Sequence, residues 1–355
     1  MDPALSIGVT TYNEEETIGR VLKTLIEESP RSSEIIVVAG GEDRTVDIVK
    51  SYARGSSKIK LLEEETRRGK PAALNRILRS ASGKIIALTD GDVLVKKGAL
   101  RRIVEAFKDD EVGAACGKVV PTNDRGSMSG FWAHFLYDTA DVQRTEACVN
   151  NTFFHLTGYL CAIRSGVIDT VPEGLLADDA VMGLLVREKG YLVGYVPDAV
   201  VEVTFPESVW DFLRQKRRTL AGFLQIEEQF GRRDRSLFQE GREGFINGLK
   251  YCRNPREVFY FLSLCLFRVF AWTLAYYDVK IRRKSLVEEW EFARTTKRGT
   301  APSEQCDASL LQASLSLQRE GVSQSSVEKL GIGEALRFED MSAIDYAAGK
   351  GHLCS

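Results

Sequence analysis

Short apolar runs alternate with segments of helical period through the first two hundred residues of the chain. Between the first two runs, Ile18, Val21, Leu22, Leu25 and Ile26 fall at i, i+3, i+4, i+7 and i+8, which gives that segment one apolar face. Strand-length runs that alternate with such helices predict an α/β fold with a mostly parallel central sheet flanked by helices. The predicted strands cover residues 5–11, 34–39, 58–62, 84–89 and 112–120, and further helices are predicted at 45–52, 70–81 and 98–107.

The pattern changes after Pro121 to glycine, serine and aromatic residues, and then returns. It predicts a strand at 158–164, a helix at 179–189 and a strand at 191–196, which extend the same sheet. Residues 208–230 are helical in period and strongly basic, and residues 231–235 (GRRDR) form a polar connector. We therefore predict a first domain over residues 1–230, a helical extension over 231–298 and a polar tail of unknown role over 299–355.

Residues 258–277 form an apolar run of 20 residues, about the length that crosses a bilayer core. Its ten Val, Leu and Phe residues favour insertion by roughly 3–6 kcal/mol, whereas the central Arg268 opposes it by about 2.5–3.5 kcal/mol. Basic residues flank both ends, which suits a helix at an anionic surface. Three interpretations stay open: a membrane span, an interfacial or re-entrant helix, and a core helix of a helical subdomain.

Charge and cysteine content narrow the classes of function. The 355 residues carry 48 Lys and Arg against 50 Asp and Glu, so the net charge of −2 provides no positive field for a polyanion. We expect no nucleic-acid partner. The seven cysteines include no C-x-x-C pair, and the chain starts with acidic residues where a signal peptide would need basic ones. These features predict a reducing, cytoplasmic compartment and no cysteine-bound metal.

Asp90, Gly91 and Asp92 follow directly after an apolar strand. Two carboxylates on either side of a glycine, at the C-terminal end of a strand, can hold a hard divalent cation that in turn holds a diphosphate. The alternative interpretation is a turn with solvated carboxylates.

Two further motifs are predicted at the same sheet edge. Thr11, Tyr12, Asn13 and Glu14 end the first strand, where open α/β sheets bind ligands, although Asn13 could instead cap the next helix. The stretch 67–70 (RRGK) opens a helix with three cations, which could clamp a phosphate or the acids at 90 and 92, or form a solvated basic turn.

The last two motifs lie further along the chain. Asp178 and Asp179 start a helix, where an aspartate can act as a general base towards a hydroxyl or simply cap the helix. Gln215 and Arg218 lie three residues apart on the basic helix and face the same way, so they could bind a diphosphate or an acceptor, or belong to a solvated basic face.

In this order, the motifs resemble those of the family 2 glycosyltransferases, which have the GT-A nucleotide-sugar-binding fold. The resemblance runs from Ser6 to Gly222 and looks most like the membrane-associated branch with cellulose-synthase-like and ceramide-glucosyltransferase-like enzymes. It implies a hexosyltransferase-type enzyme with a nucleotide-diphosphate sugar as donor and a lipid-linked or glycan hydroxyl as acceptor. It also implies a cytoplasmic catalytic domain at the cytoplasmic face of the cell membrane.

The resemblance implies roles for individual residues. Glu14 would contact the nucleoside beside Thr11 and Tyr12, and Lys70 would lie beside the nucleotide. Asp92 would ligate Mg²⁺ or Mn²⁺, with Asp90 nearby on the nucleotide sugar.

For the acceptor side, the resemblance implies that Asp179 is the catalytic base and that Asp178 lies beside it in the substrate site. Gln215 and Arg218 match a Q-x-x-R-W motif.

The sequence departs from the family pattern at three places. No aspartate stands at the end of the second strand, where the stretch 38–45 reads VAGGEDRT and the family binds the nucleobase. Asp178 occupies a position where glutamate is common, and Thr219 replaces the tryptophan of polymer-making relatives. The identity of the base and processive polymerisation are therefore left open.

An inverting transfer needs one carboxylate that deprotonates the acceptor and a metal that neutralises the leaving diphosphate. Asp179 and the Asp90/Asp92 pair fill these roles, and no second carboxylate is a candidate nucleophile for a retaining reaction. Two alternatives remain: a nucleotidyltransferase, which would use a similar sheet and metal, and a catalytically silent scaffold with the same fold.

Overall fold

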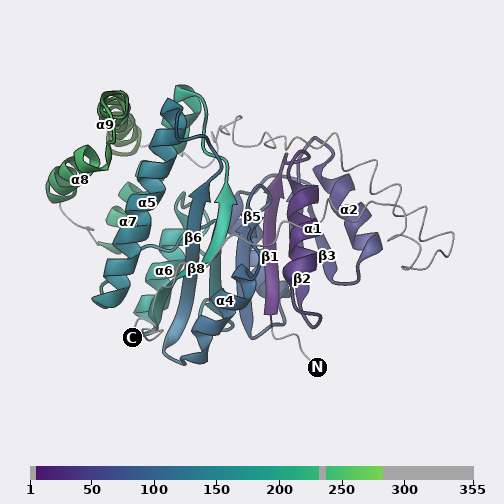
Figure 1. The fold of residues 1–355 in the computed structure, drawn as a ribbon. Helices are drawn as coiled ribbons and strands as arrows, with labels where there is room; N and C mark the ends of the chain where they lie inside the picture. The colour runs from purple at the N-terminus through teal and green to yellow at the C-terminus, as the bar shows by residue number, and fades with distance from the viewer. Residues whose placement is uncertain (1–4, 232–236, 283–355) are drawn as a thin grey trace, which may run out of the picture. The chain divides into compact units, whose positions relative to one another are not determined.

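The computed structural model describes residues 5–231 and 237–282, except for the side chains of 237–243, and these residues belong to one compact unit. Its eight-stranded sheet has the order β3-β2-β1-β4-β7-β6-β8-β5 (Figure 1). The strands are β1 (Leu5–Tyr12), β2 (Glu34–Gly40), β3 (Ile59–Glu64), β4 (Ile85–Asp90), β5 (Leu94–Val95), β6 (Val112–Pro121), β7 (Leu160–Arg164) and β8 (Leu192–Val203). The predicted strands are confirmed, although β8 continues beyond its predicted end at residue 196 and β5 was not predicted.

Parallel pairing joins β3, β2, β1 and β4, and it also joins β6 to β8. Strand β7 lies antiparallel between β4 and β6, and β5 is antiparallel to β8. Because β7 reverses direction once on each side, β4 and β6 point the same way. The C-terminal ends of β1, β4 and β6 therefore lie at one edge of a mostly parallel sheet, together with the start of β7.

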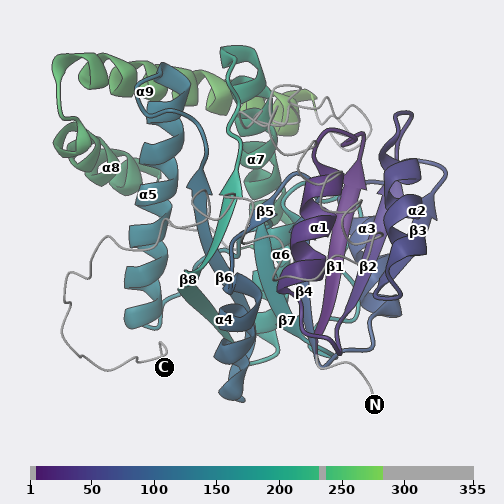
Figure 2. The ribbon, with the colours of Figure 1, turned by 45° about the vertical axis from the view of Figure 1, so that its right-hand side comes forward.

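Helices cover both faces of the sheet (Figure 2). Alternate residues of β2 face opposite sides, so Ile35 and Val37 join one apolar cluster and Ile36 and Val38 join another. The first cluster is covered by α1 (Ile18–Glu28), α2 (Thr45–Gly55) and α4 (Ala99–Glu105, continued by the 3₁₀ turn η1, Ala106–Lys108). The second is covered by α3 (Lys70–Ser80) and α6 (Asp178–Glu188). Strands β1, β2 and β4 are buried on both sides, as their apolar runs predict, whereas β3 and β8 are partly exposed.

Helix α5 (Met128–Val149) was not predicted from the sequence. Ser127 caps its start by accepting a hydrogen bond from the backbone N–H of Gly130 at 3.0 Å. Phe131, Trp132 and Ala133 are all buried although they are consecutive, because neighbouring elements pack around this part of the helix. A helix that is buried on several sides lacks the 3.6-residue stripe by which amphipathic helices are identified.

Among the described residues after β8 there are three more helices: α7 (Val209–Phe230), α8 (Leu237–Tyr251) and α9 (Pro255–Tyr276), the last continued by the π-helical turn η2 (Tyr277–Arg282). Helix α9 packs on α5 and α7 through Phe261, Leu264, Ala271 and Ala275, which are at most 1% exposed. The predicted C-terminal helical extension is thus confirmed within residues 237–282. The predicted boundary at residue 230 stays a prediction, and the tail at 299–355 lies outside the described residues.

Residues Pro255–Arg282 form the one helix in the described part of the chain that is long and apolar enough to cross a membrane. The most apolar window of this helix has a mean hydropathy of 1.8, and 28% of it is buried. One such helix does not decide between a span, an interfacial helix and a core helix.

We expect Phe261→Ala to lower the free energy of unfolding by about 3–5 kcal/mol, because its ring is 1% exposed and lies 5.3 Å from the ring centroid of Phe135. Phe259, two residues earlier, is 65% exposed, and Phe259→Ala should change the same quantity by less than about 0.5 kcal/mol. Urea denaturation followed by circular dichroism measures both. A second, separate transition that alone responds to Phe261→Ala would mean that α9 unfolds independently of the sheet domain.

Candidate active site

The candidate site lies at the sheet edge where β1 and β4 end. Thr10 on β1 donates a hydrogen bond from Oγ1 to Oδ1 of Asp90 on β4 at 2.8 Å. The backbone N–H of Gly91 donates to the carbonyl of Thr10 at 2.9 Å, which fixes the turn between Asp90 and Asp92. A Cβ atom on Gly91 would collide with the side chains of Thr11 and Glu14, so only glycine allows this close approach. The motifs at the ends of the two strands are therefore in contact, as predicted.

Lys70, the first residue of α3, extends into this edge. Its Nζ lies 2.7 Å from Oδ1 and 2.8 Å from Oδ2 of Asp90, and 3.9 Å from Oδ2 of Asp178. Burial lowers the pKa of Lys70, but the charges of Asp90 and Asp178 outweigh burial and raise this pKa above its ordinary value. Lys70 is therefore a permanent cation between two carboxylates that come from two different sequence motifs.

The two aspartates at the start of α6 have different surroundings. Asp178 is 4% exposed, and its Oδ2 atom has no hydrogen-bond partner among the described residues. Burial raises the pKa of Asp178, and the nearby Lys70 offsets part of this effect. Asp179 is only partly buried.

Asp179 is oriented by two backbone donors. Its Oδ2 accepts a hydrogen bond from the N–H of Gly158 at 3.0 Å, and its Oδ1 accepts one from the N–H of Ala180 at 2.9 Å. A Cβ atom on Gly158 would lie 3.3 Å from Nζ of Lys70 and 3.4 Å from Oδ2 of Asp179. Gly158, in the segment before β7, therefore lies close to both Lys70 and Asp179.

Helix α7 brings Arg218 to the same cluster. Its Nη2 lies 3.5 Å from the carbonyl of Leu176, just before the α6 aspartates. Burial lowers the pKa of Arg218 to about 10, while Asp178 and Asp179 oppose this shift. Gln215 lies one turn earlier on α7, and its backbone carbonyl accepts a hydrogen bond from Thr219. The structure therefore brings Arg218 to the acids and places Gln215 on the adjoining turn.

Residues at the end of β1 hold the loop that follows β2. Glu14 accepts a hydrogen bond from Thr11 Oγ1 at 2.8 Å, and its N–H donates to Thr45 Oγ1 at 2.6 Å. Asn13 accepts from the N–H of Glu42 at 2.8 Å, so it caps this loop and not α1. The guanidinium carbon of Arg67 lies over the ring of Tyr12, 5.3 Å from the ring centroid.

The sequence did not identify several side chains that line the cluster. Tyr137 of α5 donates from its hydroxyl to the hydroxyl of Tyr159 at 3.1 Å. Burial raises the pKa of both tyrosines, and the nearby Asp92 raises both further. Both side chains therefore stay neutral beside Asp92. No sequence motif marks them, because one lies on the unpredicted helix and the other precedes a short strand.

The carboxylate oxygens of Asp90 and Asp92 fit a divalent metal ion whose remaining ligands would come from the phosphates of a substrate. In the described part of the chain, no three His, Cys, Asp or Glu side chains gather into a group that could hold a metal ion alone. Asp90 and Asp92 provide hard carboxylate oxygens on either side of one glycine. Mg²⁺ is commonly held by one or two carboxylates together with substrate phosphates, and Mn²⁺ favours the same oxygen ligands.

Lys216 on α7 provides a test of the electrostatics between α7 and α9. Burial, assisted by the charge of Arg268 on α9, lowers the pKa of Lys216 to about 8. Between about pH 8 and its ordinary pKa the unfolded chain binds a proton there that the folded chain does not, so stability rises with pH in that range.

We therefore expect the free energy of unfolding to increase by about 1 kcal/mol more in the native chain than in Lys216→Met between about pH 7.5 and about pH 9.5, after allowance for partial exposure. Chemical denaturation of both proteins at the two pH values measures this difference. Equal pH dependence of the two proteins would contradict the lowered pKa.

Comparison with known proteins shows similarity to glycosyltransferases over more than half of the chain. Residues 6–169 match the family model described as glycosyl transferase family 2. The chain is 25% identical over 241 residues to a probable glycosyltransferase, YdaM, of Bacillus subtilis, covering 64% of this chain and 57% of that protein. It is 24% identical over 206 residues to the O-antigen chain rhamnosyltransferase RfbN of Salmonella typhimurium, covering 56% of this chain and 65% of that protein.

A third relative is the poly-beta-1,6-N-acetyl-D-glucosamine synthase of Staphylococcus aureus, 26% identical over 223 residues, with 61% of this chain and 53% of that protein covered. The chain thus spans about half to two-thirds of the length of these curated relatives. Among solved structures, the fold is similar to the mannosyltransferase PcManGT of Pyrobaculum calidifontis in complex with GDP-Man and Mn²⁺. The TM-score is 0.53 at 22% identity, and 84% of each chain is covered. This likeness confirms the predicted GT-A fold.

Proposed function

We propose that this chain, whose residues 6–169 match the family model described as glycosyl transferase family 2, transfers a sugar from a nucleotide-diphosphate sugar to a hydroxyl acceptor. The transfer is inverting and depends on Mg²⁺ or Mn²⁺. One observation carries the proposal: Lys70, bound between Asp90 and Asp178, joins the predicted donor acids to the predicted acceptor acids.

On the donor side, the charged side chains match a diphosphate. Asp90 and Asp92 would hold the metal ion, which when bound supplies positive charge to the leaving diphosphate. Lys70 and Arg218 place two further cations beside these acids. Fixed cations at the position where negative charge develops lower the barrier for departure of the nucleotide. Thr11, Tyr12 and Glu14, at the end of β1, would contact the nucleoside.

On the acceptor side, Asp179 is the proposed base. Its carboxylate is partly exposed and is oriented by the N–H groups of Gly158 and Ala180, so an incoming hydroxyl can reach its remaining lone pairs. Asp178 is buried beside Lys70 and is out of reach of an acceptor. It would instead keep Lys70 and Arg218 in place. One base and one departing diphosphate are the requirements of a single displacement with inversion.

The acceptor class follows from the surroundings of α7. Gln215 and Arg218 would line the acceptor side, and the apolar helix α9 packs against the same helix. We therefore propose a lipid-linked or glycan acceptor that is reached at a membrane surface, with the catalytic domain on the cytoplasmic side. The rhamnosyltransferase and the synthase among the relatives support a glycan or its lipid-linked precursor as acceptor.

Hydrolysis of a panel of nucleotide-diphosphate sugars, with Mn²⁺, with Mg²⁺ and with a chelator, tests the proposal. We expect slow, metal-dependent release of nucleoside diphosphate from at least one donor, because water can replace the acceptor. Release of diphosphate from a nucleoside triphosphate and a sugar phosphate would instead identify a nucleotidyltransferase. Absence of any turnover, together with metal-independent nucleotide binding, would indicate a silent scaffold.

A further inference from the structure

The helix formed by α9 and η2 has two faces of different composition. Glu257, Phe261, Leu264, Ala271, Ala275 and Asp278 are buried against the rest of the protein. They recur at helical spacing and define the inner face. The opposite side carries Phe259, Leu262, Leu266, Val269, Phe270 and Tyr277, which are between 47% and 67% exposed. We call this set the outer stripe, and it contains no charged residue.

The outer stripe is long, and helix α8, which contacts α9 at Phe261, also exposes apolar side chains. From residue 259 to residue 277 the stripe extends roughly 27 Å at the helical rise of 1.5 Å per residue. Phe245, Ile246 and Leu249 on α8 add three more apolar side chains that are 41–44% exposed. An exposed apolar surface of this extent marks an interaction site.

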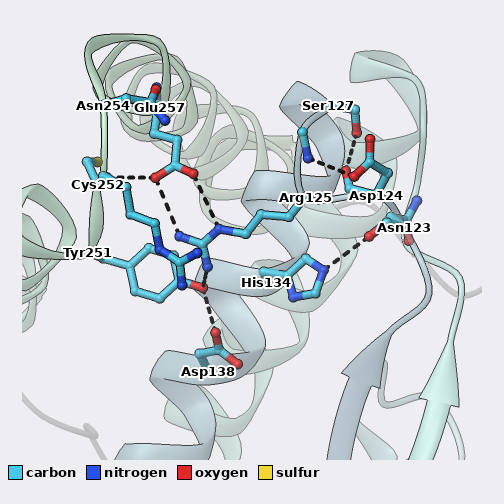
Figure 3. Close-up of polar contacts among 12 residues, drawn as sticks. Asn123, Asp124, Arg125, Ser127, His134, Asp138, Tyr251, Cys252, Asn254 and Glu257 are labelled. Carbon is cyan, nitrogen blue, oxygen red and sulfur yellow. Dashed lines mark hydrogen bonds and ion pairs between the residues drawn. The ribbon is translucent and has the colours of Figure 1, made fainter.

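Both acids in the segment 244–282 face the protein interior. Glu257 accepts hydrogen bonds from Arg125 Nε at 3.3 Å and from the N–H of Arg253 at 2.7 Å (Figure 3). Arg125 also donates to the hydroxyl of Tyr251 at 2.6 Å, and that hydroxyl donates to Asp138 of α5 at 2.5 Å. Asp278 forms an ion pair with Arg217 of α7. These contacts attach both ends of the apolar helix to the catalytic domain.

The cations of the same segment are distributed differently. Lys250, Arg253 and Arg256 are exposed at the N-terminal end of α9, and Arg282 is exposed at the end of η2. Arg268, in the middle, follows the spacing of the inner face and lies beside Lys216 of α7, and it is itself exposed. The exposed surface of residues 244–282 therefore has an apolar stripe, exposed cations at both ends, one further exposed cation (Arg268) on the side away from the stripe, and no exposed acid.

We propose that the outer stripe lies flat on the surface of an anionic phospholipid bilayer, with its apolar side chains between the lipid headgroups. An apolar face bordered by lysine and arginine is the composition that binds at this interface, since the cations attract anionic lipids. Lys250, Arg253, Arg256 and Arg282 contact the headgroups at the two ends of the helix.

The contacts of the inner face argue against the other arrangements. A membrane span would need to release Phe261 and Leu264 from α5 and α7 and to leave Glu257 and Asp278 without their arginine partners. A second copy of the chain, joined by a twofold axis across the stripe, would bring the same cations together with no exposed acid between them. A bilayer of anionic lipids satisfies both the apolar stripe and the cations.

This docking surface also places the proposed active site relative to the membrane, an extension that rests on the proposed function. Arg217 of α7 binds Asp278 at the docked helix, and Arg218, the next residue, belongs to the site cluster. The acceptor side therefore lies one helix away from the bilayer surface. An acceptor with a lipid anchor would be presented there.

Sedimentation of the full chain with vesicles tests the docking surface. We would compare vesicles of phosphatidylcholine alone with vesicles that also contain phosphatidylglycerol. The native chain should bind the anionic vesicles, and Leu266→Gln/Phe270→Gln should lower the partition coefficient at least about tenfold. The matched control is Val142→Gln/Val149→Gln on α5, where both side chains are also exposed, and it should bind like the native chain. Lys250→Gln/Arg256→Gln should weaken binding to the anionic vesicles only.

Four results would overturn the proposal. These are unchanged binding of the stripe variant, equal binding of the native chain to neutral and anionic vesicles, purification of the chain only in detergent, and a dimer in light scattering that the stripe variant dissociates. The failure of this proposal and that of the proposed function are distinguishable, because hydrolysis of a soluble nucleotide sugar requires no vesicle. The stripe variant should retain native hydrolysis and a native melting temperature, which also shows that it folds.

Discussion

Asp179→Asn should lower kcat by about 10²–10⁴-fold and leave the affinity for the donor nucleotide almost unchanged. The reason is that a general base acts on the acceptor hydroxyl in the transition state, whereas an amide at the same place cannot take the proton. The N–H groups of Gly158 and Ala180 donate to different oxygens of Asp179, so the amide oxygen can keep only one of these hydrogen bonds, and the melting temperature is measured as a control for local structure. Steady-state kinetics with a transferable acceptor, together with calorimetric titration of nucleoside diphosphate, separates the two effects.

Asp178→Asn is the matched comparison, since it changes the neighbouring carboxylate in the same way. Its raised pKa would favour Asp178 as a base, but at 4% exposure it cannot meet an acceptor hydroxyl. Its loss should instead weaken donor binding, because Lys70 and Arg218 would lose an anionic neighbour. If Asp178→Asn lowers only kcat while Asp179→Asn lowers only donor affinity, the two roles are reversed.

The sheet could be predicted from the sequence because its central strands β1, β2 and β4 are buried on both faces. Such strands read as continuous apolar runs, and the helices between them have a clear apolar stripe, as Leu22 and Leu25 of α1 illustrate. Strand order could not be predicted. The antiparallel position of β7 between β4 and β6 depends on long-range pairing that leaves no local pattern.

Helix α5 illustrates a different limit. Its first half is buried around Phe131, Trp132 and Phe135, whereas the residues from Asp138 to Ala147 are partly or fully exposed. No single apolar stripe runs through it. Its partners, Phe212 of α7 and Phe267 of α9, come from distant parts of the sequence, with ring centroids 4.9 Å and 5.6 Å from Trp132. Tertiary packing, and not local periodicity, defines this helix.

The parts of the candidate site that could be predicted are those where a charged or polar residue type stands at the end of a predicted strand. Acids at strand ends indicated Asp90 and Asp92, and the motif order resembled that of the family whose model matches residues 6–169. The ion pair of Lys70 with Asp90 is one of the interpretations that the sequence left open, whereas the contact of Lys70 with Asp178 was not predicted, because these residues lie more than 100 positions apart. The roles of individual residues remain predictions, and substitution of Asp92 tests the predicted metal ligand.

Asp92→Asn should lower kcat/KM by about 10²–10³-fold, an effect of the size found when one group that stabilises transition-state charge is removed. An amide is a weaker ligand for Mg²⁺ or Mn²⁺ than a carboxylate, so the metal should bind less tightly. Asp92 is the clearer test of the two acids, because Asp90 is also the partner of Lys70 and Thr10. Asp90→Asn would alter these contacts as well as the metal.

Calorimetric titration of nucleoside diphosphate, with and without Mn²⁺, identifies the cause of the loss. In the native chain Mn²⁺ should increase nucleotide affinity, and in Asp92→Asn this increase should disappear while metal-free affinity stays the same. Asp198→Asn, at an exposed acid on β8, should behave like the native chain. Because Asp92 is only partly buried at a turn, its substitution should leave the melting temperature nearly unchanged. A full Mn²⁺ effect in Asp92→Asn would show that the metal is held elsewhere, since a ligand that is removed without loss of affinity is not a ligand.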